Sequence, residues 1–300
     1  MTTWQGGTAV ITGAASGFGL EASRIAAQRG MNVVMADVQQ EALDRAVPEI
    51  EALGAQVLPF RLDVAKAAQV DALAAATLQR FGAPMFVFNN AGVGAGGLIW
   101  EHTVNDWDWV VGVNLMGVEH GIRAFTPMML AAAKADPAWF GHIVNTASMA
   151  GLLNPPNMGV YNATKSAVVS ISETLHQDLS LVTEQVHAHL LCPFFVTTGI
   201  HDSARNRPPQ LRDDNAPTRS QKIARAMTDK AVGSGKITAA QVAQFVFDAM
   251  DERRFYIYSH PNALAGVQTL MEDRILARNP TDPFKERPDI GAKLRADLRE

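Results

Sequence analysis

The sequence contains one cysteine and has no long apolar run. A single cysteine excludes an intrachain disulfide and is typical of the reducing cytosol, so we expect a cytoplasmic protein. No apolar stretch reaches the ~18–20 residues that a membrane-spanning helix needs. The first residues, MTTWQGGTAV, lack a basic region followed by an apolar run, so we expect no signal peptide.

An excess of positive charge is also missing. The formal net charge is −4, which gives no long-range attraction to nucleic acid or to an anionic membrane. Metal ligands are scarce as well: His187 and His189 share a strand face, but no third ligand is evident, and we expect no metal. Cys192 ends an apolar run and is expected to be a core thiol rather than a nucleophile.

Short β-rich runs alternate with alanine-rich helical segments along the first two-thirds of the chain. Strands are expected at 7–12, 31–36, 56–62, 85–89, 142–147 and 186–191, with a last one at 255–259. The segment at 20–30 is typical of the helices, and Gly30 is placed to end it. Such alternation predicts an α/β fold: a doubly wound, mostly parallel, seven-stranded sheet with helices on both faces. No repeat or low-complexity linker divides the chain, so we expect one domain over 1–300.

The composition changes near residue 200. The polar, proline-rich stretch at 201–221 fits either a disordered linker or a mobile lid over a ligand. After it, 238–252 predicts an amphipathic helix with a Thr cap, a further helix is expected over about 262–278, and the tail from Asn279 is expected to pack loosely. We therefore expect a core over 5–260, a substrate lid over about 194–235 and a C-terminal helical extension over about 261–300.

A glycine-rich turn, TGAASGFG (12–19), follows the first strand and opens a helix. Gly13, Gly17 and Gly19 would allow a tight turn and close approach of a pyrophosphate to the free amides of the helix N-terminus, although a plain turn also tolerates glycine. Asp37 ends the second strand twenty residues after Gly17. There a carboxylate can accept hydrogen bonds from an adenosine ribose, or simply cap the helix that begins near Gln39.

Asp37 also bears on the choice of cofactor. A carboxylate repels a 2′-phosphate, and the residues that surround Asp37 and the turn in the sequence supply no cation: Ser16, Val38, Gln39 and Gln40. We therefore expect NAD(H) to be preferred over NADP(H).

The stretch YNATK places Tyr161 and Lys165 one helical turn apart among small and apolar residues. The lysine could snorkel past a packed aromatic ring. Alternatively, its charge could lower the pKa of the phenol from its usual value of about 10.

Taken together, these motifs resemble the short-chain dehydrogenase/reductase family over roughly residues 7–200. TGAASGFG resembles its coenzyme motif, Asp63-Val64 its adenine-contacting pair and NNAG (89–92) its central-strand motif. Asn114 is similar to its helix asparagine and Ser148 to its catalytic serine, thirteen residues before the Tyr-x-x-x-Lys of Tyr161 and Lys165. Pro193-Phe194 departs from the usual Pro-Gly of the family.

The resemblance implies a Rossmann-type fold and hydride transfer between NAD(H) and a secondary alcohol or ketone. Tyr161 would be the general acid/base, Ser148 would bind the substrate oxygen, Lys165 would tune Tyr161 and hold the ribose, and Asn114 would anchor a water. The cofactor would be held by Gly13, Ser16, Gly17, Phe18, Gly19, Asp37, Val38, Asp63, Val64, Asn90, Ala91, Gly92, Tyr161, Lys165, Pro193, Val196 and Thr198. The alternative is a non-catalytic nucleotide sensor or scaffold on the same fold.

By position in the family plan, the substrate would meet Ser148, Met149, Leu152, Leu153, Met158, Phe194 and Phe195. These are mostly large and apolar, which favours a bulky, uncharged aryl or alicyclic compound. Arg205, Arg207 and Arg212 could instead bring a positive charge inward to meet an acid.

The resemblance also implies a homodimer or homotetramer, paired through helices over about 105–135 and 160–182. Trp100, Trp107 and Trp109 are expected to pack a helix against the sheet or a partner subunit. Tyr256 and Tyr258 share a strand face and are expected in the core.

Overall fold

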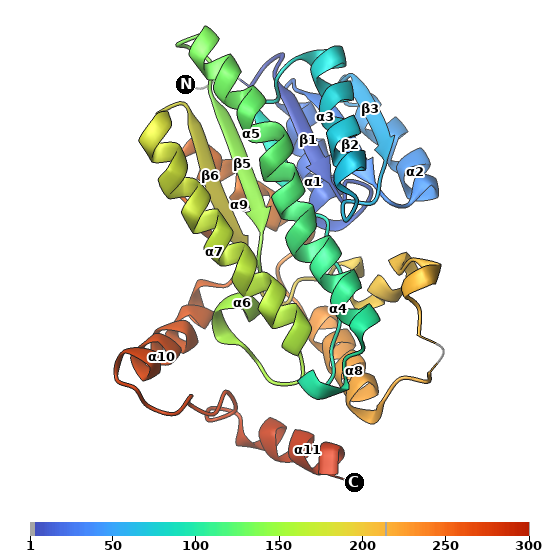
Figure 1. Cartoon of the computed structure of the whole chain (residues 1–300), viewed down its shortest axis with the longest axis vertical. Coiled ribbons are helices and arrows are strands. Elements are labelled where there is room, and N and C mark those ends of the chain that lie inside the picture. The colour runs from blue at the N-terminus through green and yellow to red at the C-terminus, as the bar shows by residue number, and fades with distance from the viewer. Residues whose placement is uncertain (1–3, 214, 300) are drawn as a thin grey trace.

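A seven-stranded sheet runs through the centre of the protein, whose computed structural model describes residues 4–213 and 215–299 (Figure 1). The strands are β1 (Thr8–Thr12), β2 (Asn32–Asp37), β3 (Val57–Arg61), β4 (Phe86–Asn89), β5 (Gly141–Thr146), β6 (Val186–Cys192) and β7 (Tyr256–Tyr258). They lie in the order β3-β2-β1-β4-β5-β6-β7, and each neighbouring pair is parallel. The doubly wound α/β arrangement is confirmed, and the described sheet is parallel throughout rather than mostly so.

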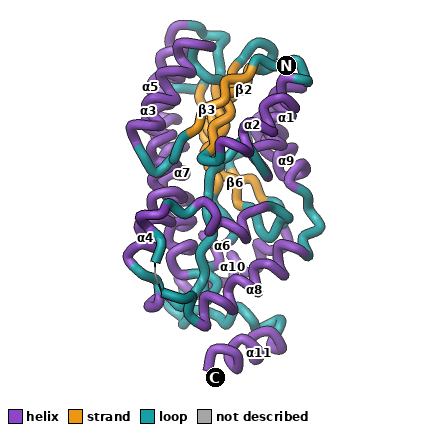
Figure 2. Tube along the Cα trace, turned by 90° about the vertical axis from the view of Figure 1, so that its right-hand side faces the viewer, coloured by secondary structure: helices purple, strands orange, loops and turns teal. Residues whose placement is uncertain are grey.

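Helices cover both faces of the sheet, as the side view in Figure 2 shows. On one face lie α1 (Gly17–Gln28), α2 (Gln40–Glu51) and α9 (Ala239–Asp251), and on the other lie α3 (Ala67–Phe81), α5 (Gly117–Ala135) and α7 (Gly159–Val182). Because every strand runs in the same direction, all the carboxyl ends meet at one edge, where α/β folds bind their ligands. None of the helices described has the length and hydropathy to cross a membrane.

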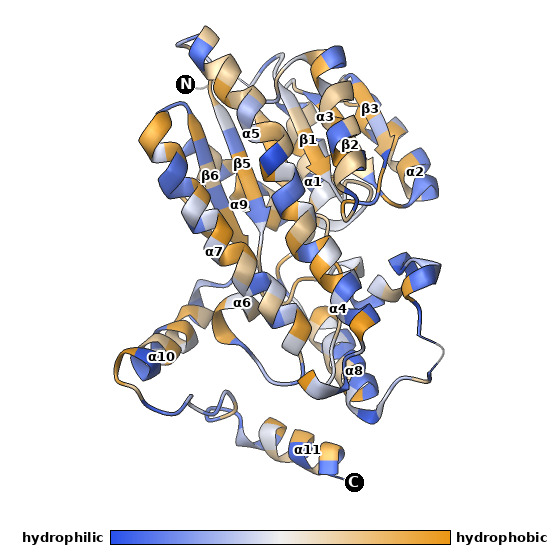
Figure 3. Cartoon of the chain, in the orientation of Figure 1, coloured by the Kyte–Doolittle hydropathy of each residue, from blue (hydrophilic) through white to orange (hydrophobic). Residues whose placement is uncertain are grey.

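Two apolar layers hold the helices to the sheet. β1, β4 and β5 are buried along their whole length, as expected for strands covered on both faces. Side chains alternate between the layers: Phe86 and Phe88 of β4 pack with Phe247 on the α1 and α9 side, whereas Val87 packs with Phe125 on the other. In Figure 3, β1 and β3 are mostly coloured as hydrophobic, in contrast to the many hydrophilic residues of α8 (Arg219–Gly233).

Helix ends follow local sequence signals. Gly30, with φ of +77°, follows α1 in the left-handed conformation that glycine adopts without strain. Thr238 caps α9, since its side chain accepts from the backbone N–H of Gln241 while the Gln241 side chain accepts from the Thr238 N–H. The predicted helix at 238–252 is therefore confirmed together with its cap.

Short elements gather beyond the carboxyl edge of the sheet, in the lower half of Figure 1. They are the 3₁₀ turns η1 (Ile99–Glu101), η3 (Gly199–Asn206), η4 (Pro209–Leu211) and η5 (Pro261–Ala263), the π-helical turn η2 (Gly112–Met116), and the helices α4 (Val104–Val111), α6 (Ala150–Leu153), α8, α10 (Leu264–Ile275) and α11 (Pro288–Arg299). α11 lies within the helical extension expected over about 261–300, in the tail from Asn279 that is expected to pack loosely. Of that helix only Gly291 and Leu294 are buried, so the rest of the tail is largely exposed, as expected.

One aromatic prediction needs correction. Tyr256, expected in the core, is 40% exposed, because β7 is the edge strand, and its hydroxyl donates to Glu173 at the surface. Of the three tryptophans, Trp109 is buried and Trp107 packs against the same apolar cluster. Trp100 is 77% exposed on η1, so for this residue only the predicted contact with a partner subunit is left.

Candidate active site

The turn after β1 forms a cradle of backbone. Gly13 and Gly17 have φ of +64° and +53°, a conformation that side chains strain. A Cβ on Gly19 would lie 2.2 Å from the carbonyl oxygen of Gly13, so only glycine fits there. The chain therefore passes close to itself, and Ser16, Gly17 and Phe18 at the start of α1 line the cavity, where the N-terminus of a helix can bind an anionic group.

The segment after β4 supports this cradle. The Thr12 Oγ1 atom accepts from the backbone N–H groups of Asn90 (3.0 Å) and Ala91 (3.1 Å), and the Asn90 side-chain amide donates to the Thr12 carbonyl (2.9 Å). The NNAG motif thus fixes the glycine-rich turn.

Asp37 holds two backbone turns at the end of β2. Its Oδ2 accepts from the Ala15 N–H (3.1 Å) and its Oδ1 from the Gln39 N–H (3.0 Å). Burial raises the pKa of Asp37, while these hydrogen bonds and the charge of Arg205 oppose the rise. The N-cap of α2 is Gln39, so Asp37 is not the helix cap that the alternative interpretation required.

The sequence did not predict that two arginines lie near Asp37. Arg61 and Arg205 line the same cavity as Asp37, and Arg205 interacts with it electrostatically. Arg205 lies on η3, far from Asp37 in the sequence, so the residues next to Asp37 in the sequence do not predict its position.

A cavity of about 660 Å³ extends from the cradle to the start of α7. This volume lies within the range of small-molecule and cofactor sites. Fifteen of the predicted cofactor residues line it: Gly13, Ser16, Gly17, Phe18, Asp37, Val38, Asp63, Val64, Asn90, Ala91, Gly92, Tyr161, Lys165, Pro193 and Thr198. Gly19 and Val196 do not line it. Both are buried, and Gly19 acts in the close packing of the turn.

Tyr161 and Lys165 lie on the first turns of α7, at the inner end of the cavity. Lys165 is only 2% exposed, and its Nζ donates to the Thr146 carbonyl (2.7 Å) and lies 5.7 Å from the centre of the Tyr161 ring. A snorkelling lysine would reach water. The buried amine therefore excludes the amphipathic-helix interpretation.

Asn114 is fully buried within the π-helical turn η2. Its side chain accepts from the Val93 N–H (2.8 Å) and donates to the Val93 carbonyl (2.9 Å). A Cβ built on Gly92 would lie 3.5 Å from the Asn114 Oδ1 and 3.7 Å from the Lys165 Nζ. These two polar atoms therefore approach the same point, which glycine keeps open.

Ser148 follows β5 and is held between two backbone segments. Its Oγ accepts from the Ala150 N–H (3.1 Å) and donates to the Pro193 carbonyl (3.4 Å).

Burial raises the pKa of Tyr161, and a hydrogen bond with Ser148 opposes the rise. Burial also lowers the pKa of Lys165 to about 8. Without cofactor, the pKa of the Tyr161 phenol is thus raised, because burial of the ring dominates. The sequence predicted the opposite, a pKa lowered by the charge of Lys165.

The predicted substrate residues surround this end without lining the cavity. Met149 is fully buried in a cluster with Leu190 and Cys192, so it belongs to the core here rather than to a pocket wall. Leu152 and Leu153 pack against the same cluster, which Leu264 and Val267 of α10 also join. Met158 is half-buried, and the Phe194 and Phe195 rings contact each other with centres 4.6 Å apart.

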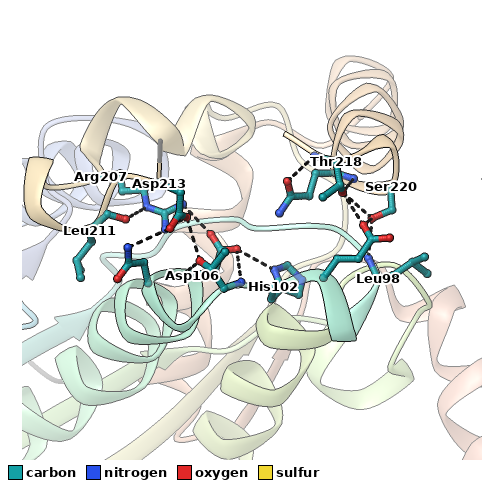
Figure 4. Close-up of polar contacts among 12 residues, drawn as sticks. Leu98, His102, Asp106, Arg207, Leu211, Asp213, Thr218 and Ser220 are labelled. Atoms are coloured by element: carbon teal, nitrogen blue, oxygen red, sulfur yellow. Dashed lines mark hydrogen bonds and ion pairs between the residues drawn. The ribbon is translucent and has the colours of Figure 1, made fainter. Parts of the chain in front are cut away.

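The described part of the predicted lid is anchored by polar contacts (Figure 4). Arg207 donates to Asp106 of α4 (2.7 Å) and to Asp213 (3.0 Å), and its guanidinium lies over the Trp109 ring. Burial would raise the pKa of Asp106, but the nearby His102 ring and hydrogen bonds from the Thr103 N–H and from Arg207 outweigh it and lower that pKa to about 2. η3, η4 and the residues between them line the same cavity as the glycine-rich turn, so this part of the predicted lid covers that cavity. Asp214, also in the predicted lid, lies outside the described residues.

His187 and His189, which share a strand face, do not form a metal site, since His189 has another partner. The His189 Nε2 lies 2.8 Å from the His142 Nδ1, which is a hydrogen-bond distance. In residues 4–213 and 215–299, no group of three or more His, Cys, Asp or Glu side chains is arranged to hold a metal ion. Cys192 is fully buried, and burial raises the pKa of its thiol to about 12.

Comparison with known proteins extends these observations. A family model described as short chain dehydrogenase matches residues 7–209. A CLA biosynthesis dehydrogenase/reductase from Lactiplantibacillus plantarum is 34% identical, over 88% of this chain and 90% of that protein. A 1-deoxy-11-beta-hydroxypentalenate dehydrogenase from Streptomyces avermitilis is 33% identical, over 91% and 93%. The crystal structure of a short-chain dehydrogenase/reductase from Burkholderia phymatum in complex with NAD is 53% identical, with a TM-score of 0.91, over 94% of this chain and 99% of that one.

Proposed function

The chain belongs to the short-chain dehydrogenase/reductase family of oxidoreductases, and from this premise we propose that it transfers a hydride between NAD(H) and a secondary alcohol or ketone. The observation that carries the proposal is that Tyr161 and Lys165 line, side by side, the cavity that also holds the glycine cradle, and that Ser148 is hydrogen-bonded to Tyr161. A sensor that only binds a nucleotide has no use for a buried phenol and amine beside each other.

The cofactor supplies the hydride acceptor or donor, and the chain supplies position and a proton. The Ser148 hydroxyl binds the substrate oxygen and holds it beside the Tyr161 phenol. Tyr161 gives its proton to that oxygen in reduction and takes it back in oxidation. Since burial keeps the Tyr161 pKa high in the chain alone, the phenol is ready to act as an acid. To act as a base it needs additional positive charge at the site.

Lys165 and Asn114 support the proton transfer. The Lys165 Nζ, held by the Thr146 carbonyl, places an ammonium group near the phenol and within reach of a ribose hydroxyl in the cavity. The Asn114 side chain, fixed by Val93, faces the same opening at Gly92 and would hold a water there. Such a water would carry the proton outward from Lys165.

NAD(H) is the preferred cofactor in this proposal. The Asp37 carboxylate is fixed at the end of β2 with lone pairs left for ribose hydroxyls. A 2′-phosphate would meet its negative charge at close range. Arg205 and Arg61 weaken that repulsion without removing the carboxylate, so the preference should be measurable but not absolute.

The substrate is proposed to be a bulky aryl or alicyclic alcohol or its ketone. Met158, Leu152, Phe194 and Phe195 give the region beside Ser148 an apolar character, which favours burial of hydrocarbon. Arg207 is held by Asp106 and Asp213, and Arg205 donates to the Gly199 and Asp202 carbonyls. Arg212 also lines the cavity. The name of the Streptomyces relative denotes a carboxylate, so Arg212 is the residue to replace if an acid proves to be the better substrate.

The test replaces Tyr161 by Phe and measures turnover of a panel of aryl and alicyclic ketones through NADH absorbance. We expect kcat to fall by ~10²–10⁴-fold, the usual contribution of a general acid, with the NADH dissociation constant nearly unchanged. Tyr258→Phe is the matched control, because it removes a phenol on β7, outside the cavity. A wild-type chain that binds NADH and turns over no member of the panel would favour the nucleotide-sensing alternative.

A further inference from the structure

One peptide group beside the active site is held from both sides. The carbonyl oxygen of Pro193 accepts from the Met149 N–H (2.9 Å) and from the Ser148 hydroxyl (3.4 Å). On the opposite side of the same peptide, the Phe194 N–H donates to the Ser259 Oγ (2.9 Å). Because the C=O and N–H of a planar trans peptide point in opposite directions, these contacts together fix the rotation of the peptide plane.

Ser259 comes from a distant part of the chain. It follows β7 directly, and it is only 1% exposed. Its Oγ also lies 2.8 Å from the His260 Nδ1. The His260 ring meets the edge of the Phe194 ring, with centres 5.8 Å apart and planes at 69°. Two consecutive residues after the last strand thus contact both the backbone and the side chain of Phe194.

This arrangement accounts for the departure from Pro-Gly. Phe194 is absent from the residues with positive φ, so the backbone here does not need glycine. Its side chain is 39% exposed and rests between Phe195 and His260. The Phe194 ring therefore occupies space at the outer side of the turn, and the N–H of the same residue is left to Ser259.

We propose that Ser259 is a positioning residue that orients Ser148 through the Pro193–Phe194 peptide. The inference rests on the proposed function, since Ser148 is the group that binds the substrate oxygen there. Without the Ser259 hydroxyl, the Phe194 N–H loses its acceptor and the peptide plane can turn. The Pro193 carbonyl then no longer fixes the Met149 N–H, so the backbone that places Ser148 beside the substrate oxygen can shift.

A double-mutant cycle tests this coupling. We expect Ser259→Ala to lower kcat/KM roughly ten- to a hundredfold, chiefly through kcat, since a misplacement on the order of 1 Å costs up to ~10²-fold. The NADH dissociation constant should change by less than about threefold, which is under 1 kcal/mol. In the Ser148→Ala background, Ser259→Ala should change kcat/KM by less than about twofold, because the group it orients is gone. Equal losses in both backgrounds would overturn the proposal.

Two further variants separate positioning from general stability. Thr77→Val removes another fully buried hydroxyl, on α3 and away from the site, and should lower the melting temperature without changing kcat. Ser259→Cys keeps a weak acceptor of similar size and should recover part of the activity lost in Ser259→Ala. A Cys variant no better than the Ala variant would contradict a role for the hydrogen bond. If Ser259→Ala does not fold, the cycle is built with Ser259→Cys instead.

Failure of the proposed function has a different signature. If the wild-type chain turns over no ketone or alcohol, the proposed function fails. The coupling is then tested by the melting temperatures of the four proteins of the cycle: the wild type, Ser148→Ala, Ser259→Ala and the double variant. Decreases that are less than additive support a shared peptide plane, whereas additive decreases overturn it.

Discussion

Asp37 combines a structural and a selective role in one side chain. It holds the Ala15 and Gln39 amides, and it faces Arg205 across the cavity. We predict that Asp37→Ser raises the ratio of kcat/KM for NADPH over NADH by on the order of tenfold, since a hydrogen bond to a charged group contributes about 1.5 kcal/mol. Val38→Arg added to it should raise the ratio further by supplying a second phosphate partner.

Arg205 provides the control for that cofactor switch. In Asp37→Ser combined with Arg205→Met, the gain for NADPH should largely disappear, because no cation from η3 would remain beside the vacated carboxylate position. Asp44→Ser, on the exposed side of α2, should leave the ratio unchanged. A wild-type chain that already uses NADPH better than NADH would show that our interpretation of Asp37 is wrong.

The buried pair of His142 and His189 should make stability depend on pH. The His189 Nδ1–H donates to the Arg254 carbonyl (2.8 Å), so its Nε2 accepts the Nδ1–H of His142, and both rings are neutral. Burial lowers the pKa of both, that of His189 to about 4. In the unfolded chain both titrate near ~6.5. Between about pH 6.5 and 4 the unfolded state therefore binds more protons, and the free energy of unfolding falls as the pH falls.

Urea unfolding at pH 8, 6, 5 and 4 measures this effect. The loss from His189 alone should approach roughly 3 kcal/mol at the acid end. His189→Gln should be less stable at pH 8 and less sensitive to acid, whereas His201→Asn, a change at an exposed histidine, should follow the wild-type curve. Parallel curves for His189→Gln and the wild type would exclude these histidines as the cause.

At the scale of elements, the segment from Gly199 to Asp213 depends on Arg207 for its position. The ion pairs of Arg207 with Asp106 and Asp213 are largely buried, with side chains 16%, 8% and 23% exposed. We predict that Arg207→Met weakens NADH binding about tenfold and lowers the free energy of unfolding by roughly 3 kcal/mol, the order seen when one partner of a buried pair is removed. Fluorescence titration with NADH and urea unfolding measure the two quantities.

Limited proteolysis locates the effect of the Arg207 variant. Cleavage within 199–213 should become faster in Arg207→Met than in the wild type, because the segment loses its attachment to α4. Arg225→Met is the matched control. The Arg225 side chain is 65% exposed, and its Nη2 lies 3.9 Å from the Asp202 Oδ1, so this ion pair is long and solvent-exposed. Equal cleavage of all three proteins would mean that other contacts hold the segment.

Secondary structure and the catalytic residues could be predicted because their signals are local. Runs such as TAVIT and NVVMA are apolar and β-branched, and their bounds agree with the structure to within a residue or two. Tyr161 and Lys165 share a helix face by spacing alone. By contrast, the position of Arg205 beside Asp37, the burial of Met149 and the contact of Ser259 with Phe194 depend on tertiary packing between distant segments. No local pattern carries that information.

Over the whole molecule, α5 and α7 present their outer faces side by side in Figure 1. On α7 the exposed residues Ala163, Ser170, Thr174 and Gln177 are spaced seven, four and three residues apart, so they share one face of the helix, and all four are small or polar. Leu181 and Val182 are also exposed, at the C-terminal end of α7. The family resemblance predicts that these two helices pair two subunits. We therefore expect a dimer or a tetramer by light scattering at micromolar concentration.

Thr174→Arg tests that assembly. A guanidinium at the centre of a paired helix face would be desolvated without a partner and should weaken association by about a hundredfold or more. Gln268→Arg, on the exposed side of α10, should leave the mass unchanged. A wild-type protein of monomeric mass would contradict the predicted assembly.

The packing of α1 against α9 brings together segments more than two hundred residues apart in the sequence. The Trp4 indole donates to Asp251 (3.0 Å), Arg29 pairs with the same carboxylate (2.8 Å), and Trp4 also meets Phe247 edge-on. As the chain leaves the ribosome, each new strand can add to the edge of a sheet already begun at β1. The side of α1 that packs against α9, however, has no cover until residues 239–251 emerge, so a chaperone can bind it during most of translation.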